Sequence, residues 1–300
     1  MNGGGILEDF KNAFNRPQNA LLQIIMINLI VFLVLLVLEV VLTLSGAANI
    51  HAMIVNQLTL PSSLDTFIFQ PWTIFTYFFT HTGFFHILFN MLFLFWFGRI
   101  IAEYLGSDRV LSLYILGGLA GGIFYILIYN ILPFFADQVA HAKMLGASAG
   151  VYAVVVGAAT LYPNYTFFLL LIGPVRIKYI ALFYVIVSFA GTTGMNAGGN
   201  LAHLGGALLG YMFIRQIQKG NDLGAPVIKS LDFLQSFFVR KPHIKVTYSS
   251  KAGPKKPVKP AKGQTKQEEI DIILDKISAS GYESLSKEEK QKLFNASKNN

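Results

Sequence analysis

The sequence has 300 residues, of which 53% are hydrophobic, 14% aromatic and only 13% charged. It contains no cysteine, which excludes structural disulfides, thiolate catalysis and cysteine-based metal sites. Ten charged side chains occur between residues 19 and 214, too few for the surface of a soluble domain of that length. These counts indicate a polytopic membrane protein.

Six apolar segments are long enough to cross a bilayer or nearly so, since a full span needs about 20 residues. We expect helices at residues 20–44, 84–105, 110–132, 147–162, 178–193 and 200–218. The fourth and fifth are short, so we expect them to lie inside the bundle. The first is too long for a signal peptide and is interpreted as a retained span. The predicted fold class is an all-α polytopic membrane protein, a bundle of six transmembrane helices over residues 20–218.

Basic residues gather at one end of these helices. They are Lys11, Arg16, Arg99, Arg109, Arg176 and Lys178. The loop at residues 45–83 has neither Lys nor Arg, and the loop at residues 133–146 has only Lys143. The positive-inside rule therefore places both termini in the cytoplasm, with residues 1–19 as a cytoplasmic N-terminal segment.

The net charge of +8 belongs to the C-terminal part of the chain. Residues 215–300 contain 17 Lys and Arg against 9 Asp and Glu, whereas residues 1–214 contain 7 of each kind. We interpret residues 219–266 as an amphipathic stretch followed by a basic linker rich in Pro and Lys. Beside a membrane, such a tail favours contact with anionic lipids over binding of nucleic acid.

The last part of the chain, residues 267–300, has apolar residues at helical spacing and is expected to form a small helical hairpin. Ser286 and Glu289 have the spacing of a capping box at the start of its second helix. The predicted fold thus ends in a short cytoplasmic helical extension, whose partner the sequence does not identify.

A serine between glycines, in Gly146-Ala147-Ser148-Ala149-Gly150, begins the fourth predicted helix. In the predicted topology Ser148, His86 and His203 each lie in the first turn of a helix that runs inward, and Asn90 lies one turn below His86. Four polar side chains in one outer layer of the bilayer indicate a site, because such groups are costly in hydrocarbon. Histidine can activate a serine near neutral pH, and asparagine or a second histidine can donate hydrogen bonds to an oxyanion.

Each of these residues also has a structural interpretation. A serine among glycines often serves helix packing, and a buried histidine or asparagine often bonds to a neighbouring helix. A soluble α/β-hydrolase elbow is excluded, because that fold places an acidic residue between serine and histidine and none occurs in residues 149–202. A dyad of Ser148 and His203 is the economical interpretation, with the ring of Tyr152 holding the imidazole.

Three motifs resemble the rhomboid intramembrane serine proteases over nearly all of residues 20–218. They are HILFN at residues 86–90, G-x-S from Gly146 followed by Tyr152, and A-H-x-x-G-x-x-x-G from residue 202 to residue 210, which includes Gly206. The resemblance implies the basic bacterial form with six spans. One departure is Thr73 after Trp72, where many members have an arginine.

The resemblance implies a role for each matched residue. Ser148 would be the nucleophile and His203 the general base, while His86, Asn90 and the backbone N–H of Ser148 would line the oxyanion hole. Asn200 matches a family position near the substrate. No metal or other cofactor is expected.

The function implied is that of an intramembrane serine endopeptidase, which cleaves transmembrane substrates near the extracytoplasmic side with a Ser-His dyad. It would lie in the inner (plasma) membrane of the cell as a multi-pass protein, with transmembrane protein substrates and membrane lipids as partners. One alternative is a catalytically silent relative that binds membrane clients, although such relatives lack the serine or the histidine. Another is a small-solute transporter, which would favour ionisable residues near mid-membrane.

Overall fold

The computed structural model describes residues 19–169, 172–238 and 266–297. It divides the chain into two compact units, Met1–Arg240 and Lys241–Asn300. The predicted N-terminal segment up to residue 18 and the basic linker at residues 239–265 lie outside the described residues.

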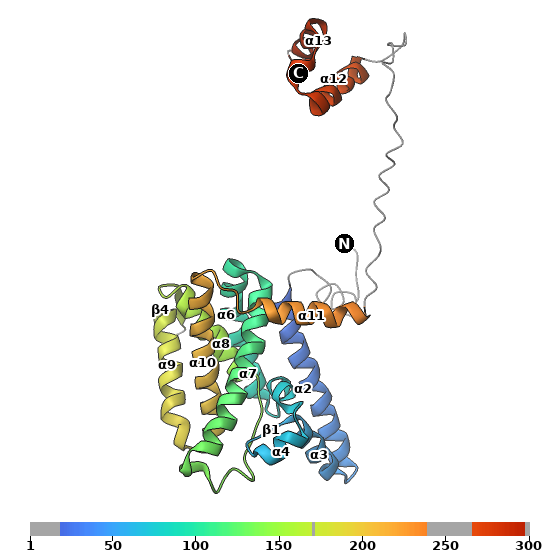
Figure 1. Cartoon of the computed structure of the whole chain (residues 1–300). Helices are drawn as coiled ribbons and strands as arrows, with labels where there is room; N and C mark the ends of the chain where they lie inside the picture. Colours follow the sequence, from blue (N-terminus) through green and yellow to red (C-terminus); the bar gives the residue numbers. More distant parts are fainter. Residues whose placement is uncertain (1–18, 170–171, 239–265, 298–300) are drawn as a thin grey trace. The chain divides into compact units, whose positions relative to one another are not determined.

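Six long helices form the first unit and run alongside one another (Figure 1). They are α2 (Ala20–Leu44), α6 (Phe84–Leu105), α7 (Ser107–Ile131), α8 (Ser148–Leu161), α9 (Ile177–Ala190) and α10 (Ala197–Gln218). Every end agrees with the predicted segments to within three residues. The expectation of an all-α membrane bundle is therefore confirmed.

The helices differ in how well their sequences suit a membrane. Among the described residues, α2, α6 and α7 are long and apolar enough to cross a bilayer by themselves. Helices α8 and α9 are apolar but shorter. As expected from its length, α8 lies inside the bundle: it packs against α6, α7, α9 and α10, and nine of its 14 residues are buried.

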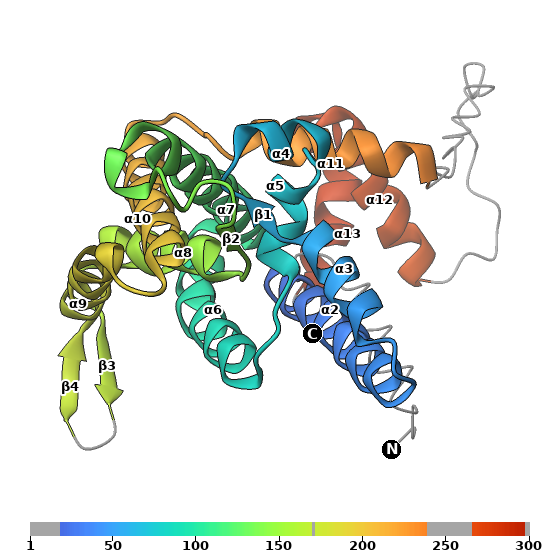
Figure 2. The same cartoon turned by 90° about the horizontal axis from the view of Figure 1, so that it is seen from below.

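The expectation that the fifth segment also lies inside the bundle is wrong. Helix α9 lies at the edge of the bundle in both views (Figures 1 and 2), and only three of its 14 residues are buried. Its large apolar side chains, such as Phe183 and Phe189, point outward and are well exposed. Such side chains are stable against lipid, so a short apolar helix does not need protein on every side.

Helices α8 and α10 approach each other closely because glycine occupies their contact. A Cβ atom at Gly206 would lie 2.8 Å from the carbonyl carbon of Ala149, and one at Gly210 would lie 2.8 Å from the Cα of Ala153. Both distances are well below the roughly 3.5 Å at which two carbon atoms pack. The two glycines therefore set how near α10 comes to the start of α8.

Short elements fill the connections. The first loop contains α3 (Ala48–Leu58), β1 (Leu60–Pro61), α4 (Leu64–Phe69), α5 (Thr73–Thr76) and η1 (Tyr77–Phe79). Later connections contain η2 (Pro133–Phe135), β2 (Lys143–Met144), β3 (Thr166–Leu169), β4 (Gly173–Arg176) and η3 (Gly191–Thr193). The short strands form two antiparallel pairs, β1 with β2 and β3 with β4, which the sequence interpretation did not predict.

The first loop positions the segment that precedes α8. Leu60 pairs with Met144 across the β1–β2 ladder, and the N–H of Gly146 donates to the carbonyl of Tyr77 at 2.9 Å. Trp72, the residue before the departure at Thr73, donates its indole N–H to the carbonyl of Gln57 within the same loop at 2.9 Å. Hydrogen bonds from two parts of the loop thus hold the start of α8 in place.

After α10 the chain forms α11 (Ala225–Phe238), which runs crosswise to the long helices (Figures 1 and 2). It lies in the amphipathic stretch that the sequence interpretation placed after residue 218, and it is part of the first compact unit.

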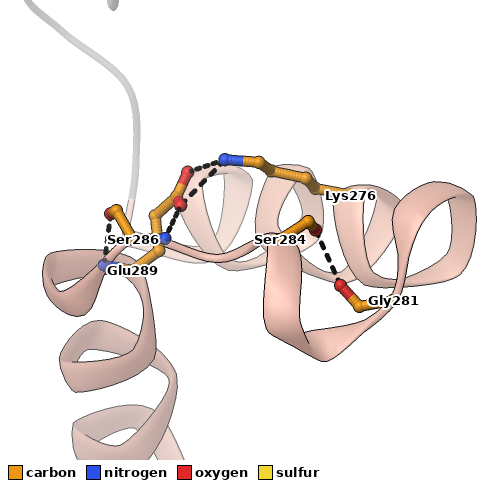
Figure 3. A network of polar contacts seen from close by, with 5 residues as sticks. All are labelled: Lys276, Gly281, Ser284, Ser286 and Glu289. Carbon is orange, nitrogen blue, oxygen red and sulfur yellow. Dashed lines mark hydrogen bonds and ion pairs between the residues drawn. The ribbon is translucent and has the colours of Figure 1, made fainter.

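The second unit contains α12 (Lys266–Ser280), η4 (Tyr282–Ser284) and α13 (Lys287–Ser297). Its capping box is confirmed: the Ser286 N–H donates to Glu289 Oε2 at 2.7 Å, and the Glu289 N–H donates to Ser286 Oγ at 3.2 Å (Figure 3). Lys276 Nζ lies 2.8 Å from Glu289 Oε1, which joins α12 to α13.

Candidate active site

Ser148 and His203 meet where α8 and α10 come closest. Ser148 is the first residue of α8, and His203 lies one turn before Gly206 on α10. The Ser148 hydroxyl oxygen and His203 Nε2 are 2.7 Å apart, which is a short hydrogen bond. The structure therefore brings together the two residues that the sequence pattern paired.

The other side of the His203 ring contacts Ser188 on α9. His203 Nδ1 lies 3.1 Å from Ser188 Oγ, and the Ser188 hydroxyl donates to Tyr152 Oη at 2.8 Å. If Nε2 accepts the Ser148 proton, Nδ1 carries the ring hydrogen and donates it to Ser188. Because the Ser188 hydroxyl donates to Tyr152, its oxygen is left to accept from Nδ1, and this arrangement favours the tautomer in which Nε2 can act as a base.

Tyr152 supports the imidazole in the way the sequence predicts. Its ring stacks on His203 with the centroids 4.1 Å apart and the planes 9° from parallel. Its hydroxyl donates toward the carbonyl of Tyr184 at 3.5 Å. The imidazole is therefore fixed by one stacking contact and by hydrogen bonds at both nitrogens.

Sequence reasoning missed Ser188. It is one of three buried residues on α9, and it is the single serine of a helix that is mostly apolar. A buried polar side chain that faces the bundle needs a hydrogen-bond partner. A serine within an apolar segment is therefore a signal in the sequence from which this residue could have been found.

His86 and Asn90 line a cavity of about 650 Å³ between α6, α8 and α9. Its other lining residues are mostly aromatic and include Tyr152, whose ring separates the cavity from His203. One Asn90 N–H donates to the carbonyl of His86 at 2.8 Å, and the amide has a second N–H to offer.

Gly146 allows His86 to lie close to the loop before Ser148. A Cβ atom at Gly146 would lie 2.8 Å from His86 Nε2, and the backbone there has φ +118°, a conformation that favours glycine. Because Ser148 begins α8, its N–H has no acceptor within the helix and is available to a ligand.

His81 is a second residue that sequence reasoning missed. It is fully buried between η1 and α6, its Nε2 accepts the N–H of Ala147 at 3.2 Å, and its ring meets that of His86 edge to face at 5.1 Å. Burial, with a smaller effect from His86, lowers the pKa of His81 well below its ordinary value. A neutral imidazole can accept the hydrogen bond, so His81 holds the loop on which Ser148 depends.

Asn200 lies near the start of α10 and does not touch the Ser148–His203 pair directly. Its side-chain N–H donates to the carbonyl of Gly191 at 2.8 Å, which ties α10 to η3 at the end of α9. This contact helps to hold α9, and with it Ser188, beside His203.

Comparison with known proteins identifies the family of the first unit. A family model described as Rhomboid domain matches residues 69–218, which is half of the 300 residues. A second model, described as a family of unknown function (DUF6576), matches residues 261–299, the region of the terminal hairpin.

Three curated relatives match the chain in part. RHOMBOID-like protein 12, mitochondrial, of Arabidopsis thaliana is 30% identical over 157 residues, which are 49% of this chain and 47% of the relative. Rhomboid-like protein 16, chloroplastic, of the same plant is 31% identical over 160 residues, 49% of each chain. Rhomboid protein 1, mitochondrial, of Saccharomyces cerevisiae is 30% identical over 150 residues, 47% of this chain and 40% of the relative. The chain thus spans half the length or less of the curated relatives that it matches.

Proposed function

The chain belongs to the rhomboid family, and from this premise we propose that it is an intramembrane serine endopeptidase. The observation that carries the proposal is the 2.7 Å hydrogen bond between the Ser148 hydroxyl and His203 Nε2. A serine becomes a nucleophile when a neighbouring base can take its proton, and this pair has that geometry.

In the proposed reaction Ser148 Oγ attacks a peptide carbonyl while His203 Nε2 takes the hydroxyl proton. The imidazolium then returns this proton to the departing amine, and an acyl-enzyme on Ser148 remains. A water molecule, deprotonated by the same Nε2, attacks the acyl carbonyl; the bond to Ser148 Oγ then breaks, the imidazolium returns the proton to this oxygen, and the carboxyl product leaves. His203 is the base in both halves of the reaction, so its orientation must persist throughout.

The dyad works without a carboxylate. Ser188 Oγ accepts a hydrogen bond from His203 Nδ1, and the Ser188 hydroxyl donates one to Tyr152 Oη. A neutral chain of hydroxyl groups thus takes the place of the acid in a triad. Such a chain fixes the tautomer and disperses part of the imidazolium charge. A buried carboxylate would instead need its own compensating partners in the membrane.

The proposed donors for the tetrahedral oxyanion come from the start of α8 and from two residues of α6 that line the cavity. The backbone N–H of Ser148, at the N-terminus of α8, has no acceptor within the helix and can donate to the oxyanion. The second N–H of Asn90 and the His86 ring supply side-chain donors. The cavity beside them is lined mainly by aromatic side chains, which suits an apolar substrate segment.

We further propose the topology and location expected from the sequence. The catalytic pair lies near the starts of α8 and α10, whereas Arg215 lies near the end of α10 and Arg109 at the start of α7, which in the proposed topology runs the opposite way. Cleavage would therefore occur near the extracytoplasmic side. Both termini would be cytoplasmic, and the membrane would be the inner (plasma) membrane of the cell. Transmembrane proteins are the proposed substrates.

The test uses purified protein in proteoliposomes with a single-span substrate labelled at both ends. The wild type should cleave it, whereas Ser148→Ala and His203→Ala should each abolish cleavage and remain folded, with Ser236→Ala on α11 as the control that keeps full activity. Full activity in either dyad variant would refute the proposal. Substrate retention by a wild type that does not cleave would instead support the silent client-binding alternative.

A further inference from the structure

The turn between α10 and α11 is attached to the start of α7. Arg109 donates to Asp222 Oδ2 at 2.6 Å. The Ser112 hydroxyl, which donates to the carbonyl of Asp108 at 2.8 Å, also lies 3.3 Å from the carbonyl oxygen of Gly224. These contacts hold the residues three and one before the start of α11, and they fix where the helix leaves the bundle.

The anchoring contact also fixes the depth at which α11 starts. Ser112 lies five residues into α7, which at 1.5 Å per residue is about 7.5 Å from the end of that helix. Figure 1 agrees, since α11 crosses the long helices below the turn that joins α6 and α7. An amphipathic helix that lies in a membrane interface is buried about 5–10 Å into the boundary between headgroups and acyl chains, a distance comparable with that of the α11 start from the end of α7.

The sequence of α11 is amphipathic. Val227, Leu231 and Leu234 follow one another at helical spacing, and Phe233 and Phe237 widen this apolar side. The opposite side carries Lys229, Asp232 and Ser236. A helix of this kind has one side suited to lipid and one suited to water.

The apolar side of α11 is largely uncovered by the described residues of the first unit. Phe233 is 64% exposed, Leu234 55% and Phe237 67%, and the two phenylalanine rings meet edge to face at 5.0 Å. With 14 residues, or about 21 Å, the helix is too short to span a hydrocarbon core of about 30 Å. It runs across the bundle axis, which is the orientation of an in-plane helix (Figures 1 and 2).

We propose that α11 is an in-plane membrane anchor, which inserts Phe233, Leu234 and Phe237 among the acyl chains of the leaflet that surrounds the start of α7. Lys229 and Ser236 then face the headgroups and water. The partner is the lipid bilayer, because α11 starts about 7.5 Å along α7 from the end of that helix, and α7 is long and apolar enough to cross a membrane. Residues 239–265, which follow directly, contain eight Lys and Arg and no Asp or Glu, and this composition favours an anionic leaflet at the same place. This inference does not depend on proteolytic activity.

The absence of cysteine makes the test direct, since a single introduced thiol is the sole site of labelling. Phe237→Cys and Leu234→Cys report on the apolar side of α11, and Ser236→Cys on the polar side is the matched control. Each variant carries an environment-sensitive nitrobenzoxadiazole label in nanodiscs of phosphatidylethanolamine and phosphatidylglycerol. The quenchers are aqueous iodide and a phospholipid with a nitroxide near the top of its acyl chain.

The labels at positions 234 and 237 should show blue-shifted emission, strong quenching by the lipid nitroxide and weak quenching by iodide. The label at position 236 should show the reverse. Equal iodide quenching at all three positions would overturn the proposal. A label at position 237 that is shielded from iodide yet not quenched by the lipid nitroxide would overturn it as well, because protein such as a second copy of the chain would then cover this side.

Discussion

Gly206→Ala tests whether close helix packing sets the activity of the site. Gly206 lies three residues after His203 on α10 and faces Ala149, the residue after Ser148. An added methyl group at residue 206 would meet the backbone of α8 and not a flexible side chain, so the two helices would have to separate. The separation acts directly on the distance between Ser148 and His203.

The size of the effect follows from the contact distances. The new Cβ would lie 2.8 Å from the Ala149 carbonyl carbon, and a separation of at least ~0.7 Å is needed to reach the roughly 3.5 Å of carbon packing. The same movement lengthens the 2.7 Å hydrogen bond between Ser148 and His203 to about 3.4 Å, beyond the reach of proton transfer. A misplacement near 1 Å costs about 10²-fold in rate, or about 2.7 kcal/mol.

The assay compares Gly206→Ala with Gly157→Ala on α8. A Cβ at Gly157 would lie 3.4 Å from Leu113 Cδ1 and 3.6 Å from Ile214 Cγ1, both ordinary contacts with flexible side chains. Turnover of a single-span substrate is measured on the monodisperse fraction of each protein, so that loss of folded material does not count as loss of activity. Activity of Gly206→Ala within a few-fold of that of Gly157→Ala would refute the reasoning.

Three further outcomes are expected. Asn90→Ala and His86→Ala should each lower turnover by about 10²–10³-fold, the usual cost of one lost oxyanion donor, and should reduce labelling of Ser148 by a fluorophosphonate less than they reduce cleavage. Unchanged cleavage in both variants would mean that backbone groups alone stabilise the oxyanion. Ser188→Ala should lower kcat by roughly 5- to 10-fold, about the value of one hydrogen bond, with little change in KM. Ser188→Thr should restore kcat, and a lowered kcat in both variants would instead indicate an effect on packing. The hydrogen bond from Lys276 lowers the pKa of Glu289 from 4.5 to about 2. The ionised Glu289 side chain therefore stabilises the terminal hairpin above pH 4.5, and this stabilisation is lost as the pH falls toward 2. Amide NMR signals of the hairpin in the full chain should follow this dependence and lose it in Glu289→Gln; signals that are constant to pH 2 would contradict it.

The positions of the long helices could be predicted because length and apolar composition decide them directly. The neighbourhood of Ser148 and His203 could be predicted as well, since both lie near the starts of helices that run in the same direction. Length was misleading for α9, because a short helix was taken to need protein around it. Its outward side chains are large and apolar, and lipid satisfies them.

Other contacts between distant segments could not be predicted. The bond between Ser188 and His203 depends on how α9 and α10 cross, and no spacing in the sequence encodes that crossing. The amphipathic character of α11 is visible in the sequence, but its direction depends on Arg109 and Asp222, which are 113 residues apart. Such features require the packed structure, because each rests on the relative placement of two helices.

The central claim is that Ser148 is a nucleophile because His203 is its base. Reaction of the purified wild type with a fluorophosphonate, followed by peptide mass mapping, measures this most directly. We expect a single stoichiometric adduct on Ser148 and loss of that adduct in His203→Ala. An adduct on another serine, or equal labelling of Ser148 without His203, would contradict the claim.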